Sequence, residues 1–314
     1  FTADANLYIG AVSLLPTDSF HGMRRDVVAL LKQIGCRLLR WPGGNFAGDY
    51  RWQDGLLPVD RRAPLASVLP METLAHTDGY DCHEIGTDEF LALCEEIGAE
   101  PTLTINPACE GPELAAAWVE YCNGDTTTRW GRVRAERGRV EPYHVRYWSL
   151  GNEFGQGHME GPNTPAGYAR HIRPYALAMR ELDPSILLVC SGDYSRNEWF
   201  TDGLRQLDDV VDFVAHHHYT AMMRPTHMRN YSGPVGDEDF QFIATNPTAA
   251  IAQELEELRN RIDIHAREGC RPTISLDEWN VWHAWHRIPG VVEGIHNASM
   301  LNFLCNEADT VAVS

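Results

Sequence analysis

Apolar residues in this chain gather in short continuous runs, separated by longer stretches of mixed polarity. The short runs lack the strict apolar–polar alternation of a strand with one face in water. Continuous apolar runs are typical of strands in a parallel sheet that is covered on both faces. We therefore expect eight strands, at Leu7–Val12, Arg37–Trp41, Pro101–Ile105, Val145–Leu150, Ile186–Cys190, Val211–His216, Thr273–Leu276 and Thr310–Val313.

Helix-like patterns occupy most of the stretches between these strands. Seven helices are expected, at Arg24–Ile34, Thr87–Ile97, Glu113–Tyr121, Pro165–Leu182, Glu198–Gln206, Ala249–Glu268 and Val292–Asn306. This alternation in a chain of this length is typical of a (β/α)8 barrel. An open doubly wound sheet is the competing fold, but the phosphate-binding glycine fingerprint after the first strand is absent. The sequence therefore predicts one α/β domain over residues 1–314, a (β/α)8 TIM barrel whose long loops 42–86 and 220–246 lie on the site-forming face.

Composition narrows the classes of partner. The chain has 314 residues and a formal net charge of −18, which argues against nucleic acid or an anionic membrane as a partner. No apolar run approaches the ~20 residues that span a bilayer. The eight cysteines form no C-x-x-C pair, which favours free thiols in a reducing, cytoplasmic compartment. The chain begins with Phe1 rather than Met, so processing or truncation could have removed a signal peptide.

Two glutamates follow expected strands four and seven. Residues 145–153 read VRYWSLGNE and residues 273–280 read TISLDEWN, so each apolar run ends on a glutamate, Glu153 or Glu278. Strands four and seven lie three places apart in a closed barrel, and their ends converge over one opening. An isolated glutamate is usually a solvated surface charge. Two carboxylates that converge at strand ends are the requirement for hydrolysis of a glycosidic bond.

Residues beside these glutamates suit a sugar substrate. Gly151 allows the backbone to leave strand four sharply, and the amide of Asn152 can bind a sugar hydroxyl. Trp279 and Trp282 offer apolar faces for the C–H faces of a sugar ring. Trp148, in the middle of its strand, is expected in the core.

A second group of polar residues follows expected strands two and six. The turn PGGN would direct Asn45 into the mouth of the barrel, although such turns are common. In the run HHHY, alternation places His216 and His218 on one side and His217 on the other. Two histidines on one side suggest zinc, but no further set of ligands accompanies them, so hydrogen bonds to substrate or nucleophile are favoured. No metal or organic cofactor is expected.

Longer motifs carry a resemblance over essentially the whole chain. In order, RWPGGNFAGDYRWQDG, GTDEFLALCEEIGAEP, AAAWVEYCNG, YWSLGNE and LDEWNVWH resemble the α-L-arabinofuranosidases of glycoside hydrolase family 51. The resemblance implies a retaining hydrolase on a clan A (β/α)8 barrel, with Glu153 as acid/base and Glu278 as nucleophile. It further implies that Asn45 and Asn152 bind the glycone, with His217, Tyr219 and Trp282 as additional substrate-binding residues.

Three features depart from the family pattern. No glutamate stands near the end of expected strand one, where the family usually has one that holds the arabinofuranose ring. The segments FGQGHMEGPNTP and INPACEGPE also differ from the usual ones. The last helix and the family's C-terminal β-sandwich are missing, which we interpret as truncation. Relatives commonly form trimers or hexamers, so a homo-oligomer is expected as well.

The expected reaction is double displacement by an exo-acting enzyme. Glu153 donates a proton to the glycosidic oxygen while Glu278 attacks the anomeric carbon, and Glu153 then activates water. The negative charge of Glu278 is expected to raise the pKa of Glu153. The substrate would be an arabinose-containing oligosaccharide or polysaccharide from hemicellulose or pectin. A β-glycosidase or endo-β-glucanase, a metal-dependent amidohydrolase and a catalytically silent sugar-binding barrel remain alternatives.

Overall fold

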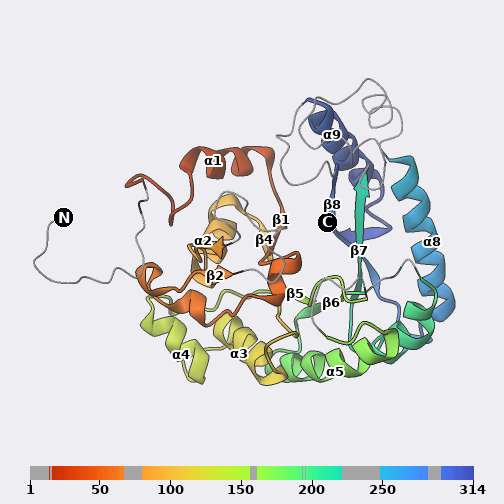
Figure 1. Cartoon of the computed structure of the whole chain (residues 1–314), viewed down its shortest axis with the longest axis horizontal. Helices are drawn as coiled ribbons and strands as arrows, with labels where there is room; N and C mark the ends of the chain where they lie inside the picture. The colour runs from red at the N-terminus through yellow and green to blue at the C-terminus, as the bar shows by residue number, and fades with distance from the viewer. Residues whose placement is uncertain are drawn as a thin grey trace, which may run out of the picture.

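A parallel sheet forms the centre of the molecule in the computed structural model, which describes residues 14, 16–66, 80–155, 161–192, 194, 196–220, 248–281 and 291–314. Neighbouring strands are parallel throughout, in the order β1-β4-β5-β6-β7-β8-β9. The strands are β1 Leu38–Trp41, β4 Glu100–Thr104, β5 Tyr147–Leu150, β6 Leu187–Cys190, β7 Phe213–Thr220, β8 Thr273–Val281 and β9 Val311–Val313. These correspond to expected strands two to eight, whereas Leu7–Val12 lies outside the described residues. The sheet is curved (Figure 1), and the predicted α/β barrel class is confirmed.

Helices lie around the outside of the curved sheet (Figure 1). They are α1 Arg25–Ile34, α2 Thr87–Ile97, α3 Pro112–Asn123, α4 Arg129–Glu136, α5 Pro165–Leu182, α8 Ala249–His265 and α9 Val291–Asn306. The expected helix at 198–206 is instead a π-helical turn, η5 Trp199–Gly203, followed by the 3-10 turn η6 Leu204–Gln206. The α4 helix was not expected, because its sequence RWGRVRAE presents few apolar residues. It is held at its start by Thr128, whose hydroxyl accepts a hydrogen bond from the Gly131 N–H.

The long segment after β1 contains short elements over its described residues, 42–66 and 80–86. These are the 3-10 turns η1 Asn45–Gly48, η2 Asp54–Leu56 and η3 Val59–Arg61, and the antiparallel pair β2 Leu65–Ala66 and β3 Tyr80–Asp81. This agrees with its prediction as a loop region at the carboxyl end of a strand.

Two apolar clusters cover the two faces of the sheet. The larger one joins strands to helices and contains Trp52, Trp118 and Trp148, whose rings stack or meet edge to face. Trp148 is fully buried, as expected for a core residue. The smaller cluster contains strand residues only, among them Val189 and Phe213, and therefore fills the concave face. Aromatic packing behind β1 and β5 fixes the strands that lead into the site.

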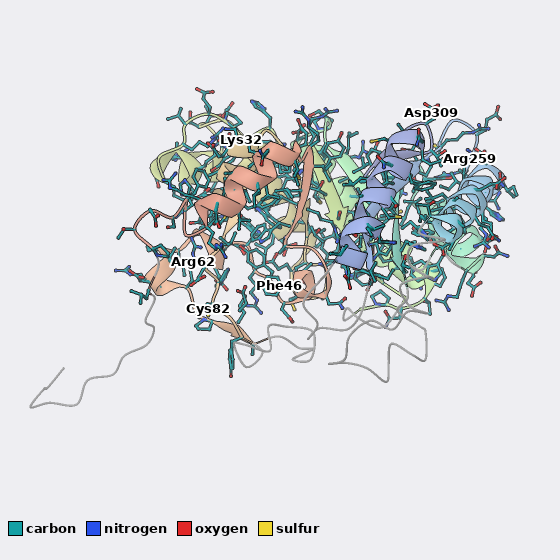
Figure 2. All side chains as sticks on the ribbon, turned by 90° about the horizontal axis from the view of Figure 1, so that it is seen from above. Lys32, Phe46, Arg62, Cys82, Arg259 and Asp309 are labelled. Carbon is teal, nitrogen blue, oxygen red and sulfur yellow. The ribbon has the colours of Figure 1, made fainter. Side chains whose placement is uncertain are left out.

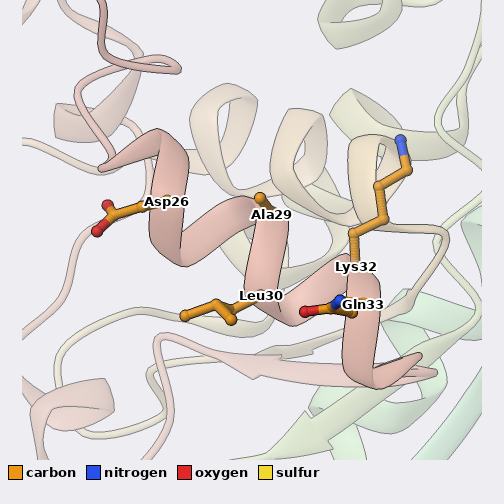
Figure 3. A pocket seen from close by; sticks show the side chains of 5 residues that line it. All are labelled: Asp26, Ala29, Leu30, Lys32 and Gln33. Atoms are coloured by element: carbon orange, nitrogen blue, oxygen red, sulfur yellow. The ribbon is translucent and has the colours of Figure 1, made fainter.

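The outer surface of α1 carries a shallow depression. Its lining consists of Asp26, Ala29, Leu30, Lys32 and Gln33, all on one helix (Figure 3). An ion pair of 2.9 Å between Lys32 Nζ and Glu96 Oε1 joins α1 to α2, and Lys32 marks this helix in the view from above (Figure 2). None of the predicted site residues lines this depression. Among the described residues, no helix is both long enough and apolar enough to cross a membrane.

Candidate active site

Glu153 stands on an unusual backbone at the carboxyl end of β5. The strand ends at Leu150, and Gly151 follows with φ +86°. A Cβ atom at position 151 would collide with the ring of Phe154, so the sharp exit requires glycine. Glu153 itself has φ +46°, a conformation that costs a non-glycine residue free energy and concentrates at functional sites. Because of these two backbone conformations the chain leaves the strand before Glu153, and the Glu153 carboxylate points to the mouth of the barrel.

A bulge in β8 changes the direction of two neighbouring carboxylates. In the pairing of β7 with β8, His216 lies opposite Leu276 but His217 lies opposite Glu278, so Asp277 is the extra residue. Regular alternation would place Asp277 and Glu278 on opposite faces. The bulge instead allows both to contact Arg40: Nε lies 3.4 Å from Asp277 Oδ2 and Nη1 lies 2.7 Å from Glu278 Oε1. The strand also continues to Val281, beyond the expected end at Leu276.

The carboxylates of Glu153 and Glu278 meet at His217. Its Nδ1 lies 2.7 Å from Glu153 Oε1 and 3.4 Å from Glu278 Oε2. One ligand atom from each of these three residues lies within 4.8 Å of the others. The two glutamate side chains are 13% and 14% exposed, so they are accessible from the mouth but largely shielded from water. The sequence correctly predicts that strands three places apart bring these glutamates together.

The alternation expected for the histidine run is confirmed, but the expectation that His216 and His218 bond to substrate or nucleophile is wrong, because both bond to Glu254. His217 and Tyr219 point toward the glutamates, and the Tyr219 hydroxyl donates a 2.7 Å hydrogen bond to Glu278 Oε2. His216 and His218 point the other way and bond to Glu254 of α8. The β7 strand extends to Thr220, further than the expected end at His216, and this extension carries both inward residues.

Buried positive charge balances the carboxylates. Burial alone would lower the pKa of Arg40, but Asp277 and Glu278 raise it above its usual value. Burial would likewise lower the pKa of His217, yet Asp277, Glu153 and Glu278 raise it to about 10, so the imidazole is cationic at neutral pH. For Asp277 burial raises the pKa, while Arg40 and His217 bring it below the usual range. The ionised Asp277 therefore lies between two cations, Arg40 and His217.

Tyr219 remains a hydrogen-bond donor throughout the neutral range. Burial and the negative charge of Glu278 raise the pKa of its phenol well above the usual value. Its proton is thus available to Glu278 at neutral pH.

The predicted asparagines lie beside Arg40. The Asn152 side chain is fully buried; its Oδ1 accepts a 2.7 Å hydrogen bond from Arg40 Nη2, and its Nδ2 donates to Asn45 Oδ1 at 3.2 Å. Asn45 begins η1 and reaches the site edge as expected. Trp282 lies outside the described residues, so its predicted contact with substrate stays a prediction.

Sequence reasoning missed Arg40 and Asp277. Arg40 lies within the apolar run LLRW of β1, where a charged side chain in a covered strand signals a buried partner. This signal was sufficient to predict that Arg40 pairs with a buried acidic side chain. Asp277 had no comparable signal, because only the bulge turns it toward Arg40 and His217.

Glu153, His217 and Glu278 are also the group of described residues that could hold a metal ion. A histidine binds a metal through a neutral ring nitrogen. Since the pKa of His217 is raised to about 10, the ring would have to lose a proton that its three acidic neighbours stabilise. The arrangement therefore favours ion pairs over metal coordination at neutral pH.

Comparison with known proteins identifies the family. The model of the α-L-arabinofuranosidase 1 domain matches residues 30–233. α-L-Arabinofuranosidase C of Emericella nidulans is 34% identical over 279 residues, which cover 85% of this chain and 52% of that protein. The chain belongs to the α-L-arabinofuranosidases of glycoside hydrolase family 51. An intracellular exo-α-(1→5)-L-arabinofuranosidase of Halalkalibacterium halodurans is 31% identical over 322 residues, covering 95% of this chain and 61% of its own length.

Solved structures of the family share the fold. The arabinose complex of the Thermotoga maritima α-L-arabinofuranosidase superposes with a TM-score of 0.78 at 30% identity, covering 98% of this chain and 60% of that one. The thermostable family 51 enzyme of Thermotoga petrophila gives a TM-score of 0.78 at 32% identity, covering 95% and 58%. The chain thus spans about half the length of its fungal relative, at 52%.

Proposed function

We propose that this chain carries the catalytic centre of a retaining α-L-arabinofuranosidase that acts on the ends of arabinose-containing glycans. The separation of the two glutamates carries this proposal, because an oxygen of each lies within 4.8 Å of the other. Retaining glycosidases place their two carboxyl groups ~5–5.5 Å apart, whereas inverting enzymes leave ~6.5–9.5 Å for a water molecule. The identity of the sugar is inferred from family membership, since the relatives are named as arabinofuranosidases.

In the first step, Glu278 acts as the nucleophile. One of its oxygens forms a bond to the anomeric carbon while the bond from that carbon to the leaving oxygen breaks. Protonated Glu153 gives its proton to the leaving oxygen, so the aglycone departs as a neutral alcohol. Arg40 and Tyr219 each hold one oxygen of Glu278, at 2.7 Å, and so orient the carboxylate for attack.

In the second step, Glu153 acts as a base. It removes a proton from water as the water oxygen attacks the anomeric carbon, and the ester bond to Glu278 breaks. The His217 cation lies beside both carboxylates and stabilises whichever is ionised: Glu278 before the first step and Glu153 after it. One imidazolium between the two glutamates thus serves both halves of the cycle.

Replacing Tyr219 with Phe tests the support of the nucleophile. A hydrogen bond to a charged group contributes about 1.5–3 kcal/mol, so losing it should reduce kcat by roughly ten- to a hundredfold. The Michaelis constant should change little, because the hydroxyl contacts Glu278. Steady-state kinetics with 4-nitrophenyl α-L-arabinofuranoside measures both values, and an unchanged kcat would remove Tyr219 from the mechanism.

A panel of nitrophenyl glycosides tests the proposed sugar. We expect the α-L-arabinofuranoside to be hydrolysed far faster than the β-xyloside, β-glucoside or β-galactofuranoside, and arabino-oligosaccharides to release free arabinose from one end. Activity should persist after dialysis against a chelator. Preference for the glucoside or xyloside would contradict the proposed glycone, and loss of activity on chelation that zinc restores would contradict the two-carboxylate mechanism.

The same proposal includes a reducing compartment. All eight cysteines are free thiols in the structure. The Halalkalibacterium relative is named as intracellular. Both observations support a cytoplasmic location.

A further inference from the structure

The outward face of β7 carries polar side chains where a covered strand normally carries apolar ones. His216, His218 and Thr220 alternate with the inward His217 and Tyr219 along the same five residues. His218 and Thr220 are each only 8% exposed, so they are buried beneath the helices rather than solvated. Burying polar groups costs free energy unless they are paired. Their partners therefore indicate what they do.

Both outward histidines bond to a single oxygen of α8. Glu254 Oε2 lies 3.0 Å from His216 Nε2 and 2.8 Å from His218 Nδ1. Glu254 stands in the first half of α8, and its side chain is 44% exposed. One carboxylate thus connects the helix to two alternate positions of the strand.

The Thr220 hydroxyl connects β7 to α9. The Thr220 hydroxyl lies 3.4 Å from His218 Nε2 and 3.5 Å from His296 Nε2. His296 is fully buried, and burial lowers its pKa to about 4, with His218 adding to the shift, so the ring is neutral. The carboxyl end of β7 is therefore attached to both neighbouring helices through side chains rather than by apolar packing alone.

We propose that Glu254 is a positioning residue for the active site, acting through His216 and His218 on the strand that carries His217 and Tyr219. The inward contacts of that strand are short, at 2.7 Å from His217 to Glu153 and 2.7 Å from Tyr219 to Glu278. Strand residues alternate at fixed geometry, so fixing positions 216 and 218 from outside also fixes 217 and 219 inside. The inference rests on the proposed function for its kinetic consequences but not for its structural ones.

The charge of Glu254 supports this assignment. Burial raises the pKa of Glu254, but the bonds from His216 and His218 lower it to about 2. The residue is therefore a carboxylate at neutral pH, and its two bonds are charge-assisted.

Replacing Glu254 tests the inference through the leaving group. A displaced Tyr219 should slow attack on both substrates alike. A displaced His217 should add a loss of proton donation, because its ring lies 2.7 Å from Glu153 but 3.4 Å from Glu278. In Glu254→Ala we expect kcat on an arabinobiose, which has a poor leaving group, to fall roughly tenfold or more, since small misplacements are costly. With the activated 4-nitrophenyl substrate, the decrease should be several times smaller. Glu254→Gln keeps an oxygen acceptor and should restore part of the loss.

The matched control is Glu257→Ala on the same helix. Glu257 bonds to Gln253 and lies near Arg261, both on α8, and its side chain is 52% exposed. The Glu257→Ala variant should keep the wild-type kcat on both substrates. If Glu254 had a purely structural role, its replacement would reduce the fraction of folded enzyme and lower the activities on the two substrates equally. Equal decreases would therefore overturn the inference. Unchanged activity on both substrates would overturn it as well.

The nitrogen resonances of the His217 ring provide a measurement that does not depend on activity. In Glu254→Ala or Glu254→Gln, the Nδ1 signal should shift away from that of the wild type, while Glu257→Ala leaves it in place. If the wild-type chain hydrolyses no arabinofuranoside, the proposed function fails and this shift alone decides the inference. An unchanged His217 signal in a folded Glu254 variant would contradict it.

Discussion

Glu278→Gln is expected to lower kcat for arabinofuranoside hydrolysis by roughly 10⁴-fold or more, the scale seen when a covalent nucleophile is removed. The amide keeps the shape of the side chain but has one acceptor oxygen in place of two, so only one of the donors Arg40 and Tyr219 keeps its acceptor. It cannot form the ester that splits the reaction into two steps. Initial rates with 4-nitrophenyl α-L-arabinofuranoside at saturating substrate measure the loss.

A control separates chemistry from folding. Glu100→Gln makes the same substitution at the exposed first residue of β4. This residue lies at the amino end of its strand, whereas the site lies at the carboxyl ends of the parallel strands. The control variant should retain wild-type activity, and both variants should show cooperative thermal unfolding. Near-normal hydrolysis by Glu278→Gln would end its assignment as the nucleophile.

Glu153→Ala should divide substrates according to their leaving groups. Without the acid, an alcohol leaving group must depart as an alkoxide, so kcat/KM on arabino-oligosaccharides should fall by roughly 10²–10⁴-fold. A dinitrophenolate needs no proton, so its release should remain fast. Turnover of that activated substrate then stops at the ester, because no base activates water.

Azide should bypass the missing base in this variant. As a small anion it can enter the space left by the carboxylate beside His217, attack the ester without giving up a proton and release a glycosyl azide. Steady-state turnover of the activated substrate should rise with azide concentration in Glu153→Ala and not in the wild type. If poor and activated leaving groups suffer equally, and azide has no effect, Glu153 is not the acid/base.

Hydrophobic patterning was sufficient for most of the fold. Seven of the expected strands appear in the described residues in the expected order, because a strand buried on both faces needs a continuous apolar run. That order is what brings Glu153 and Glu278 together. The alternation of the histidine run followed from strand geometry alone, which placed His217 opposite His216 and His218.

Local irregularities were not accessible from the sequence. The bulge at Asp277 depends on how β8 pairs with β7, and the residue type at position 277 does not predict it. The α4 helix is stabilised by its cap and by Arg134, whose buried guanidinium donates to the carbonyls of Tyr121 and Val140. A buried arginine in a polar helix gives no apolar period to detect. The apolar pattern of the sequence therefore predicts elements that are stabilised by burial, but not elements such as the β8 bulge and α4 that depend on particular polar contacts.

Trapping the covalent intermediate tests the central claim most directly. Glu153→Ala mixed with 2,4-dinitrophenyl α-L-arabinofuranoside should accumulate protein heavier by one arabinosyl unit, and mass spectrometry of its peptides should place the sugar on Glu278. Substituting Glu278 as well should abolish the label. Attachment of the sugar to another side chain, or continued turnover with inverted configuration and no adduct, would contradict a reaction carried by these two glutamates.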